Sequence, residues 1–143
     1  MAIPTHIRLE FVTPERALAH EEVDELQLPG EEGYFGVLPG HAPLLAALRT
    51  GEMWYRKGTE VHYAFIDGGF AEILPDRVSI MAQVAERAED IDLQRAEAAK
   101  LRAENTLSKP TAADAEAERT RIAMLRAITR LNVAARARQR HHH

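Results

Sequence analysis

The sequence predicts an α+β protein, in which an N-terminal antiparallel β-sandwich or flattened barrel precedes an antiparallel hairpin of two helices. The glycines indicate the boundary, because all eight lie at or before Gly69. The balance of basic and acidic residues changes close to the same boundary. Residues 1–84 contain six basic and thirteen acidic side chains, whereas residues 85–143 contain twelve and nine. The first part is thus acidic, and after Glu118 the only charged residues of the second part are arginines. This difference indicates two modules with different partners.

Short runs rich in β-branched and aromatic residues fill the first part and are typical of strands. These runs are Ile7–Val12, Glu21–Leu28, Glu52–Gly58, Glu60–Asp67, Phe70–Leu74 and Arg77–Val84. Turn signals follow at Lys57-Gly58, Gly68-Gly69 and Pro75-Asp76. Because turns recur about every ten residues, with no helical pattern between them, the strands are predicted to pair antiparallel.

The second part has the composition of helices. Residues 90–108 are dominated by Ala, Leu, Glu, Lys, Arg and Gln, which favour helix. Pro110 interrupts this pattern, and Thr111, with Asp114 three residues later, predicts the N-cap of a second helix that extends to about Arg138. A short break between two helices predicts an antiparallel hairpin.

The two predicted helices offer unequal packing surfaces. We expect the second helix to present one apolar stripe, made of Leu125, Ile128, Leu131 and Ala135. The facing residues of the first helix are mostly alanine, at positions 96, 99 and 103. Alanine buries little apolar area, so the hairpin is predicted to be weakly held and able to move.

The sequence gives no sign of a self-contained active site. It has no cysteine, and no GxSxG, strand-associated GxGxxG or GxxxxGK[ST] motif. Its histidines, His6, His20, His41 and His62, lack the paired spacing of metal ligands. For His41, a hydrogen bond to a neighbouring backbone group is favoured over catalysis. The chain is therefore interpreted as an interaction module.

The ends of the sequence add little. The N-terminus lacks the basic and apolar regions of a signal peptide, and no run approaches the roughly 20 apolar residues of a membrane helix. The closing residues 141–143 are three histidines, interpreted as a possible remnant of an expression tag.

Three motifs occur in order: GEEGYFGVLPGHAPLLAALRTG, FIDGGFAEI and IDLQRA. Together they resemble the ε subunit of bacterial F-type ATP synthases, over nearly the whole chain. The resemblance implies a sandwich of about ten strands in residues 1–86, which binds the γ subunit and the c-ring, and a regulatory helical hairpin in residues 87–140.

The resemblance also implies a role without catalysis. By this resemblance, we expect the subunit to couple c-ring rotation to the catalytic head as part of the central stalk. We also expect its hairpin to inhibit ATP hydrolysis when it extends toward the α and β subunits of the head. The resemblance implies a peripheral location on the cytoplasmic face of the bacterial inner membrane, or on the thylakoid membrane if the subunit is chloroplast-encoded. No cofactor is required, and ATP is a possible regulatory ligand.

The glycine-rich motif corresponds to the family's loop that faces the c-ring. The resemblance assigns Glu31, Glu32, Tyr34 and Phe35 to this contact, with His41 and Ala42 directed toward γ. Exposed aromatic residues beside glycine turns suit an interface, since they supply contact area at low entropic cost. The alternative is that the two aromatic residues close the end of the sandwich.

The IDLQRA motif fits a pattern that marks an ATP site in some bacterial ε subunits. The resemblance assigns this site to seven residues: Glu86, Ile91, Asp92, Arg95, Ala96, Arg126 and Arg130. The last two arginines are four residues apart, so they share one helix face and can hold phosphate oxygens. Alternatively, Asp92 is only an acid in the first helical turn, and the arginines are solvated or paired with Glu97 and its neighbours.

Two other function classes remain open from the sequence. A free-standing ATP sensor or scaffold protein could use the same two modules. Nucleic-acid binding through the arginine-rich end is disfavoured, because the acidic first part would repel phosphate and lacks a basic stripe with interleaved aromatic residues.

Overall fold

The computed structural model describes residues 3–109 and 114–141. Its strands are β1 (Ile7–Val12), β2 (Ala17–Val23), β3 (Glu25–Gly30), β4 (Gly33–Val37), β5 (Leu44–Lys57), β6 (Glu60–Leu74) and β7 (Arg77–Arg87). A 3₁₀ turn, η1 (Ala88–Asp90), leads to helices α1 (Leu93–Leu107) and α2 (Asp114–His141). The predicted cap at Thr111 and the Pro110 break lie outside the described residues.

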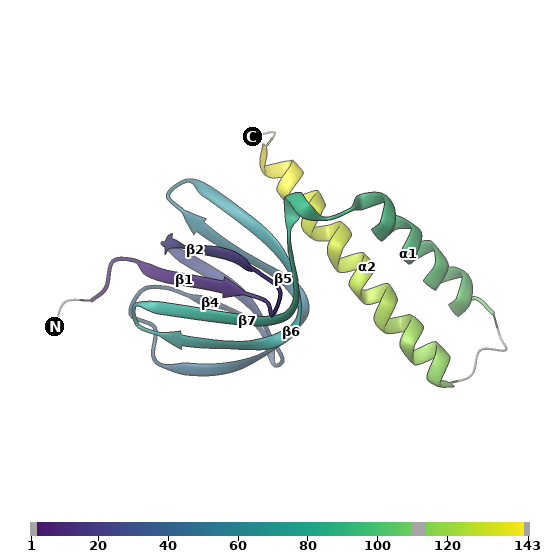
Figure 1. Cartoon of the computed structure of the whole chain (residues 1–143), viewed down its shortest axis with the longest axis horizontal. Coiled ribbons are helices and arrows are strands. Elements are labelled where there is room, and N and C mark those ends of the chain that lie inside the picture. Colours follow the sequence, from purple (N-terminus) through teal and green to yellow (C-terminus); the bar gives the residue numbers. More distant parts are fainter. Residues whose placement is uncertain (1–2, 110–113, 142–143) are drawn as a thin grey trace.

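The strands form one hydrogen-bonded sheet in the order β2-β1-β7-β6-β5-β3-β4. Neighbouring strands are antiparallel, apart from the parallel pair β1 and β7. The sheet folds over onto itself, since β2 contacts β5 although three strands separate them in the sheet order (Figure 1). Its apolar side chains meet in a single core between the layers. The predicted sandwich followed by two helices is confirmed.

Long strands explain why the described residues contain seven strands and not about ten. β5, β6 and β7 have 14, 15 and 11 residues and curve through the sandwich (Figure 1). The runs predicted as two strands, Glu60–Asp67 and Phe70–Leu74, are both parts of β6. The turns predicted at Lys57-Gly58 and Pro75-Asp76 are present.

The predicted turn at Gly68-Gly69 is wrong. These residues lie inside β6, with φ values of +79° and +124°. The pairing with both neighbouring strands is interrupted at Gly68 and resumes at Gly69. A Cβ atom on Gly69 would lie 2.3 Å from the Met81 carbonyl oxygen, so only glycine fits there. The glycine pair produces an irregularity within a continuous strand.

The run Glu21–Leu28 is divided and not continuous. Asp24 separates β2 from β3, and its Oδ2 accepts a hydrogen bond of 2.7 Å from the backbone N–H of Gly58. The glycine-rich motif, Gly30–Gly51, also contains β4 and the first part of β5. Sequence periodicity missed these segments because glycine and proline interrupt the alternation of side chains.

Helix α2 lies against both the sandwich and α1 (Figure 1). Ala96 and Ala103 of α1 are buried, as the alanine pattern predicted. The predicted stripe on α2 is wrong, because Leu125 is 50% exposed and the buried residues are Ala127, Val133 and Ala134. The contact side of α2 uses small residues, which allow close approach to two neighbours at once. The larger apolar residues Ile122 and Leu125 of α2 are left exposed.

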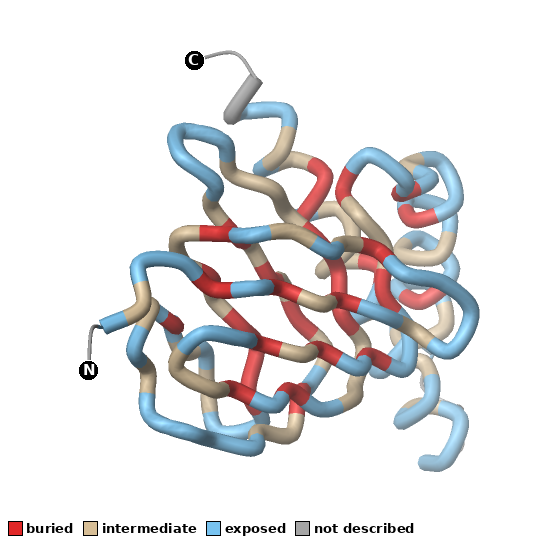
Figure 2. Tube along the Cα trace, turned by 60° about the vertical axis from the view of Figure 1, so that its left-hand side comes forward, coloured by how far each residue is buried: buried red, intermediate tan, exposed pale blue. Residues whose placement is uncertain are grey.

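A second, smaller core joins the helices to the sandwich. It contains Phe65, Ala88, Ile91, Val133 and Ala134. Figure 2 shows buried positions concentrated in the strands, whereas much of the hairpin is exposed. Among the described residues, no helix is long and apolar enough to span a membrane. The hairpin is therefore attached to the sandwich over a small apolar contact.

Candidate functional site

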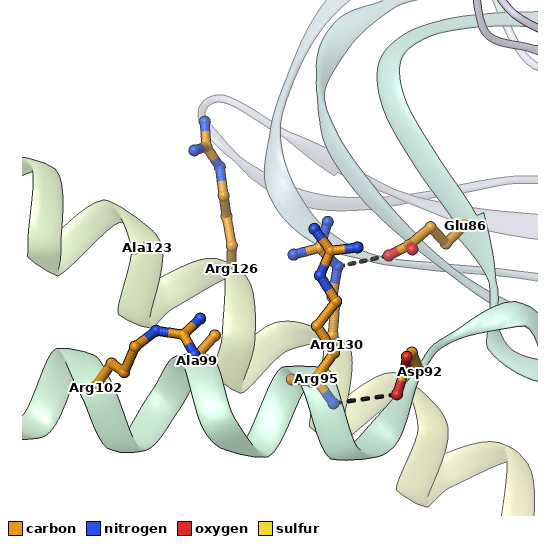
Figure 3. A pocket seen from close by; sticks show the side chains of 9 residues that line it. Glu86, Asp92, Arg95, Ala99, Arg102, Ala123, Arg126 and Arg130 are labelled. Atoms are coloured by element: carbon orange, nitrogen blue, oxygen red, sulfur yellow. Dashed lines mark hydrogen bonds and ion pairs between the residues drawn. The ribbon is translucent and has the colours of Figure 1, made fainter.

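A cleft of about 300 Å³ lies where α1, α2 and the end of β7 meet (Figure 3). Four arginines project into its lining: Arg95 and Arg102 from α1, and Arg126 and Arg130 from α2. The other lining residues are Glu86, Asp92, Ala96, Ala99 and Ala123. Four guanidinium groups against two carboxylates give the cleft an excess of positive charge.

The structure brings six of the seven predicted ATP-site residues into this one cleft. The seventh, Ile91, is buried beside it in the smaller core, next to Phe65 and Val133. The sequence analysis missed Arg102. A signal was available, since Arg102 lies seven residues after Arg95 and two helical turns place both on one face.

Local sequence explains how the residues of α1 reach the cleft. Asp92 is the N-cap of α1, and its Oδ1 accepts a hydrogen bond of 3.1 Å from the backbone N–H of Arg95. Asp92 therefore caps α1 and also lines the cleft. Ala96 and Ala99 follow on the same side, and their small side chains leave space between the helices.

The arginines of α2 are paired with carboxylates of the sandwich. Arg130 Nε donates to Glu86 Oε1 at 2.5 Å, and its guanidinium lies 4.4 Å from the centre of the Phe65 ring. Arg126 Nε lies 2.6 Å from Asp67 Oδ2. Neither pairs with Glu97. Within the described ranges, Arg95 and Arg102 have no acidic partner within ion-pair distance.

These features define what the cleft can bind. Guanidinium groups form two parallel hydrogen bonds to phosphate or carboxylate oxygens. Several guanidiniums around one cleft suit an anion with many oxygens, such as a polyphosphate. Among the described residues, no three His, Asp or Glu side chains are grouped to hold a metal ion.

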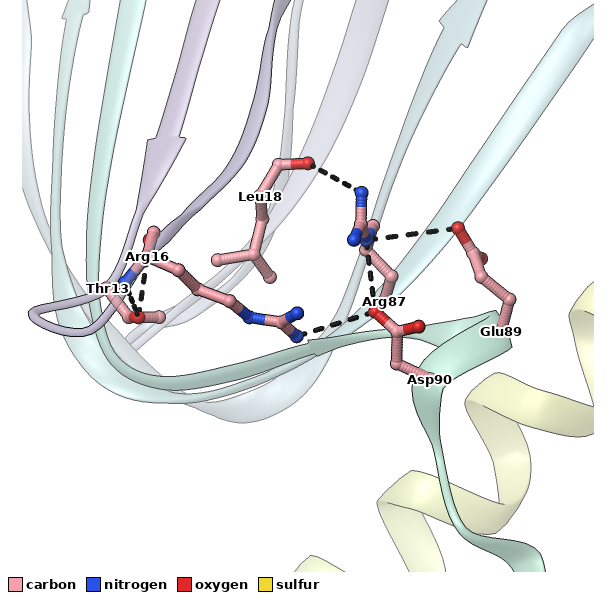
Figure 4. Close-up of polar contacts among 6 residues, drawn as sticks. All are labelled: Thr13, Arg16, Leu18, Arg87, Glu89 and Asp90. Carbon is pink, nitrogen blue, oxygen red and sulfur yellow. Dashed lines mark hydrogen bonds and ion pairs between the residues drawn. The ribbon is translucent and has the colours of Figure 1, made fainter.

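A polar network anchors the linker before the cleft to the sandwich (Figure 4). Asp90 Oδ2 lies 3.1 Å from Arg87 Nε and 3.4 Å from Arg16 Nη2. Arg87 Nη1 also donates to the Leu18 carbonyl oxygen at 3.4 Å. The turn between β1 and β2 is thus tied to η1, which fixes where α1 begins.

A third ion pair joins α2 to the sandwich away from the cleft. Arg136 Nη1 lies 3.0 Å from Glu52 Oε1, although Oε1 has no aligned hydrogen bond. The Glu52 side chain is only 13% exposed. Burial raises the pKa of Glu52, and the nearby Arg136 charge partly opposes this rise.

The predicted interface loop forms a second cleft, of about 500 Å³, between residues 30–35 and 44–47. Glu31 and Glu32 are exposed in it, and Phe35 packs partly on the core. Tyr34 is 48% exposed, with the Arg49 guanidinium 5.0 Å from its ring centre. Phe35 is thus partly covered by the core of the sandwich, whereas the exposed Tyr34 ring is available for contact with a partner protein.

His41 and Ala42 lie outside the lining of this second cleft. His41 Nδ1 lies 2.6 Å from the Ala42 carbonyl oxygen, and the His41 N–H donates to the Leu38 carbonyl oxygen at 3.1 Å. The interpretation of His41 as a turn residue bonded to neighbouring backbone is confirmed.

Comparison with known proteins gives the chain its family. Residues 6–88 match the beta-sandwich domain of the ATP synthase delta/epsilon chain, and residues 89–135 match its long alpha-helix domain. The chain belongs to the ATP synthase delta/epsilon family. The prediction from the three sequence motifs is confirmed.

Curated relatives of this family cover nearly the whole chain. The ATP synthase epsilon chain 2 of Syntrophotalea carbinolica is 47% identical over 130 residues, which are 91% of this chain and 94% of the relative. The ATP synthase epsilon chain of Syntrophobacter fumaroxidans is 48% identical over 128 residues, which are 90% and 95% of the two proteins. As a member of this group, the chain is a non-catalytic subunit, as predicted.

Solved structures show the same fold. A chain of the Euglena gracilis mitochondrial ATP synthase, from a structure of OSCP, F1 and c-ring in rotational state 1, has a TM-score of 0.79 at 26% identity. The match covers 90% of this chain and 81% of that chain. A chain from the central stalk and c-ring of the Tetrahymena thermophila enzyme has a TM-score of 0.59 at 15% identity, covering 93% and 99%. This second match supports the fold alone.

Proposed function

We propose that this subunit works in the rotor of a bacterial F-type ATP synthase, and that ATP in the arginine-lined cleft regulates it. In this role the sandwich binds γ and stands on the c-ring, so rotation of the ring is passed to the catalytic head. The similarity to epsilon chains and to a chain of an F1 and c-ring assembly supports this placement. The complex holds the subunit peripherally at the cytoplasmic face of the inner membrane.

The loop cleft is the proposed site of contact with the c-ring. Glu31 and Glu32 offer charge at its rim, and Tyr34 offers a half-exposed ring held by Arg49. An aromatic side chain held in place loses little conformational entropy when a partner covers it. His41 and Ala42 remain proposed contacts of γ, beside this cleft.

One observation carries the proposal of an ATP site: residues from β7, α1 and α2 converge on one cleft with four arginines. The arginines would bind the triphosphate, and the alanines with the adjoining Ile91 would face the base. A ligand held by all three elements stabilises the docked hairpin, because it binds that arrangement better than an extended one. ATP is thus proposed as a regulatory ligand.

Release of the hairpin from the sandwich is the proposed mode of regulation. Without ATP the hairpin leaves the sandwich and extends toward the α and β subunits, where it restrains ATP hydrolysis. After Glu118 the chain carries arginines and no carboxylate, which suits contact with acidic surfaces. The small apolar contact between hairpin and sandwich makes such release energetically accessible.

Calorimetric titration of the full chain with ATP tests the site. We expect saturable binding that Arg126→Ala and Arg130→Ala each weaken by about tenfold or more, since each removes a charge-assisted hydrogen bond to phosphate. Arg121→Ala is the control, because Arg121 lies on the same helix but pairs with Glu118 outside the cleft. A flat titration of the unmodified chain contradicts the proposal, as does equal binding by all variants.

A further inference from the structure

Asp67 lies behind the cleft and holds one of its arginines. Its side chain is 14% exposed, and its Oδ2 lies 2.6 Å from Arg126 Nε. Thr50 donates to the other oxygen, Oδ1, at 2.5 Å. Both carboxylate oxygens are therefore engaged, one with β5 and the other with α2. Asp67 itself does not line the cleft.

The direction of the Arg126 side chain follows from this contact. Figure 3 shows Arg126 extending away from α1, whereas Arg130 points to Glu86, with which it is hydrogen-bonded. A phosphate group between α1 and α2 could use Arg95, Arg102 and Arg130 without rotating Arg126. A phosphate that also binds Arg126 Nε must displace Asp67 Oδ2 from that atom.

We propose that Asp67 is an internal competitor of the phosphate ligand: it occupies Arg126 while the hairpin is docked on the sandwich and thereby lowers the affinity of the cleft. This inference rests on the proposed ATP site and adds its regulation. The carboxylate and the phosphate are both anions that a guanidinium binds through the same N–H groups. An Asp67 left without Arg126 would also repel a phosphate bound nearby.

The sign of the effect does not depend on how firmly the hairpin is docked. In the ligand-bound state Asp67 has lost its partner, so its charge only disfavours that state. Removing the charge of Asp67 therefore strengthens phosphate binding. This holds whether the hairpin of the ligand-free protein is docked on the sandwich or released from it. In the ligand-free protein the same change removes one of the ion pairs that hold α2 on the sandwich.

Asp67→Asn in the full chain tests this inference. The isosteric amide keeps the shape and can still accept from Thr50, but has no charge to hold Arg126. We expect calorimetry to show a Kd for ATP about tenfold lower than that of the unmodified chain, with a similar gain for inorganic tripolyphosphate, which lacks the base. The gain should shrink when Arg126→Ala is present, because the competition acts through Arg126.

Glu118→Gln is the matched control, since it removes a carboxylate paired with an α2 arginine outside the cleft. It should leave ATP affinity unchanged. Hydrogen exchange without ligand provides a second measurement. Asp67→Asn should speed amide exchange in α2 around Arg126, and Glu118→Gln should not.

The outcomes separate this inference from the proposed function. Equal affinity of the unmodified chain and Asp67→Asn would overturn the competitor role and leave the ATP site intact. Weaker binding by Asp67→Asn would also overturn it, because Asp67 would then orient Arg126 toward the phosphate. If neither form binds ATP, the proposed site is wrong and the inference fails with it.

Discussion

The Arg130 side chain makes two contacts with the sandwich and also lines the cleft. It pairs with Glu86, lies over the Phe65 ring and lines the cleft. The sequence resemblance placed Arg130 and Glu86 in one site, but neither their ion pair nor the Phe65 contact could be foreseen. The two charged residues are 44 positions apart. Their pairing depends on how α2 crosses the sandwich, and local sequence does not encode that crossing.

Asp67 shows a different limit of sequence analysis. It stands directly before Gly68 and Gly69, which a local interpretation assigns to a turn. The structure keeps these glycines inside β6, where Asp67 can meet both Thr50 and Arg126. An acid before two glycines is normally interpreted as part of a turn, so the position of Asp67 behind the cleft was missed.

Glu52 provides a prediction about pH. Burial raises its pKa above the ordinary value of 4.5, so the folded protein disfavours the charged form. The stabilisation from protonated Glu52 is complete below the ordinary pKa and is lost as the pH rises through the raised value. Glu52→Gln mimics the protonated form. We therefore expect it to raise the free energy of unfolding at about pH 7 but not below the ordinary pKa.

Denaturant unfolding followed by the fluorescence of Trp54, the chain's single tryptophan, measures this effect. Glu118→Gln, on the exposed side of α2, should show no such pH-dependent gain. A Glu52→Gln protein that is less stable at neutral pH would contradict the argument. The Arg136 contact would then outweigh the cost of burying the Glu52 charge.

At the scale of elements, the helices were easier to predict than their packing. The amino-acid composition predicted both helices, and the spacing of the alanines predicted which side of α1 is buried. The stripe predicted for α2 was wrong because it assumed a single partner. α2 contacts both α1 and the sandwich. Its buried positions, Ala127, Val133 and Ala134, therefore do not follow one stripe of large side chains.

The alanine contact between the helices can be tested directly. Ala103 is 4% exposed, so Ala103→Leu forces extra volume into the contact between α1 and α2. We expect a cost of about 1–3 kcal/mol to the docked hairpin, seen as faster amide exchange in both helices. Ala98→Leu is the control, because Ala98 is exposed on the same helix. Equal exchange in the two variants would show that the helices are not closely packed at Ala103.

For the molecule as a whole, the sandwich and the hairpin have separate proposed tasks. Removing residues 90–143 should leave the sandwich able to assemble with γ, because its core contains no residue of the hairpin. ATP hydrolysis by the assembled complex should rise under conditions in which the hairpin inhibits. Hydrolysis at the full-length rate under those conditions would show that the hairpin does not restrain this enzyme.

The architecture and the cleft were predictable to different degrees. Glycine distribution and charge asymmetry gave the division into two parts, and three motifs gave the family. The resemblance also grouped six residues that share one cleft, although they lie on three elements. Arg102 was missed although its spacing from Arg95 is visible in the sequence. Asp67 and the ion pairs of α2 required the tertiary arrangement, since their partners come from distant parts of the chain.

In the proposed regulation, ATP holds the hairpin on the sandwich. Hydrogen exchange of the full chain, with and without saturating ATP, measures this most directly. ATP should slow amide exchange in both α1 and α2, and Arg130→Ala should abolish the slowing at the same ATP concentration. If ATP binds by calorimetry while exchange in both helices stays unchanged, the nucleotide does not hold the hairpin and the account is wrong.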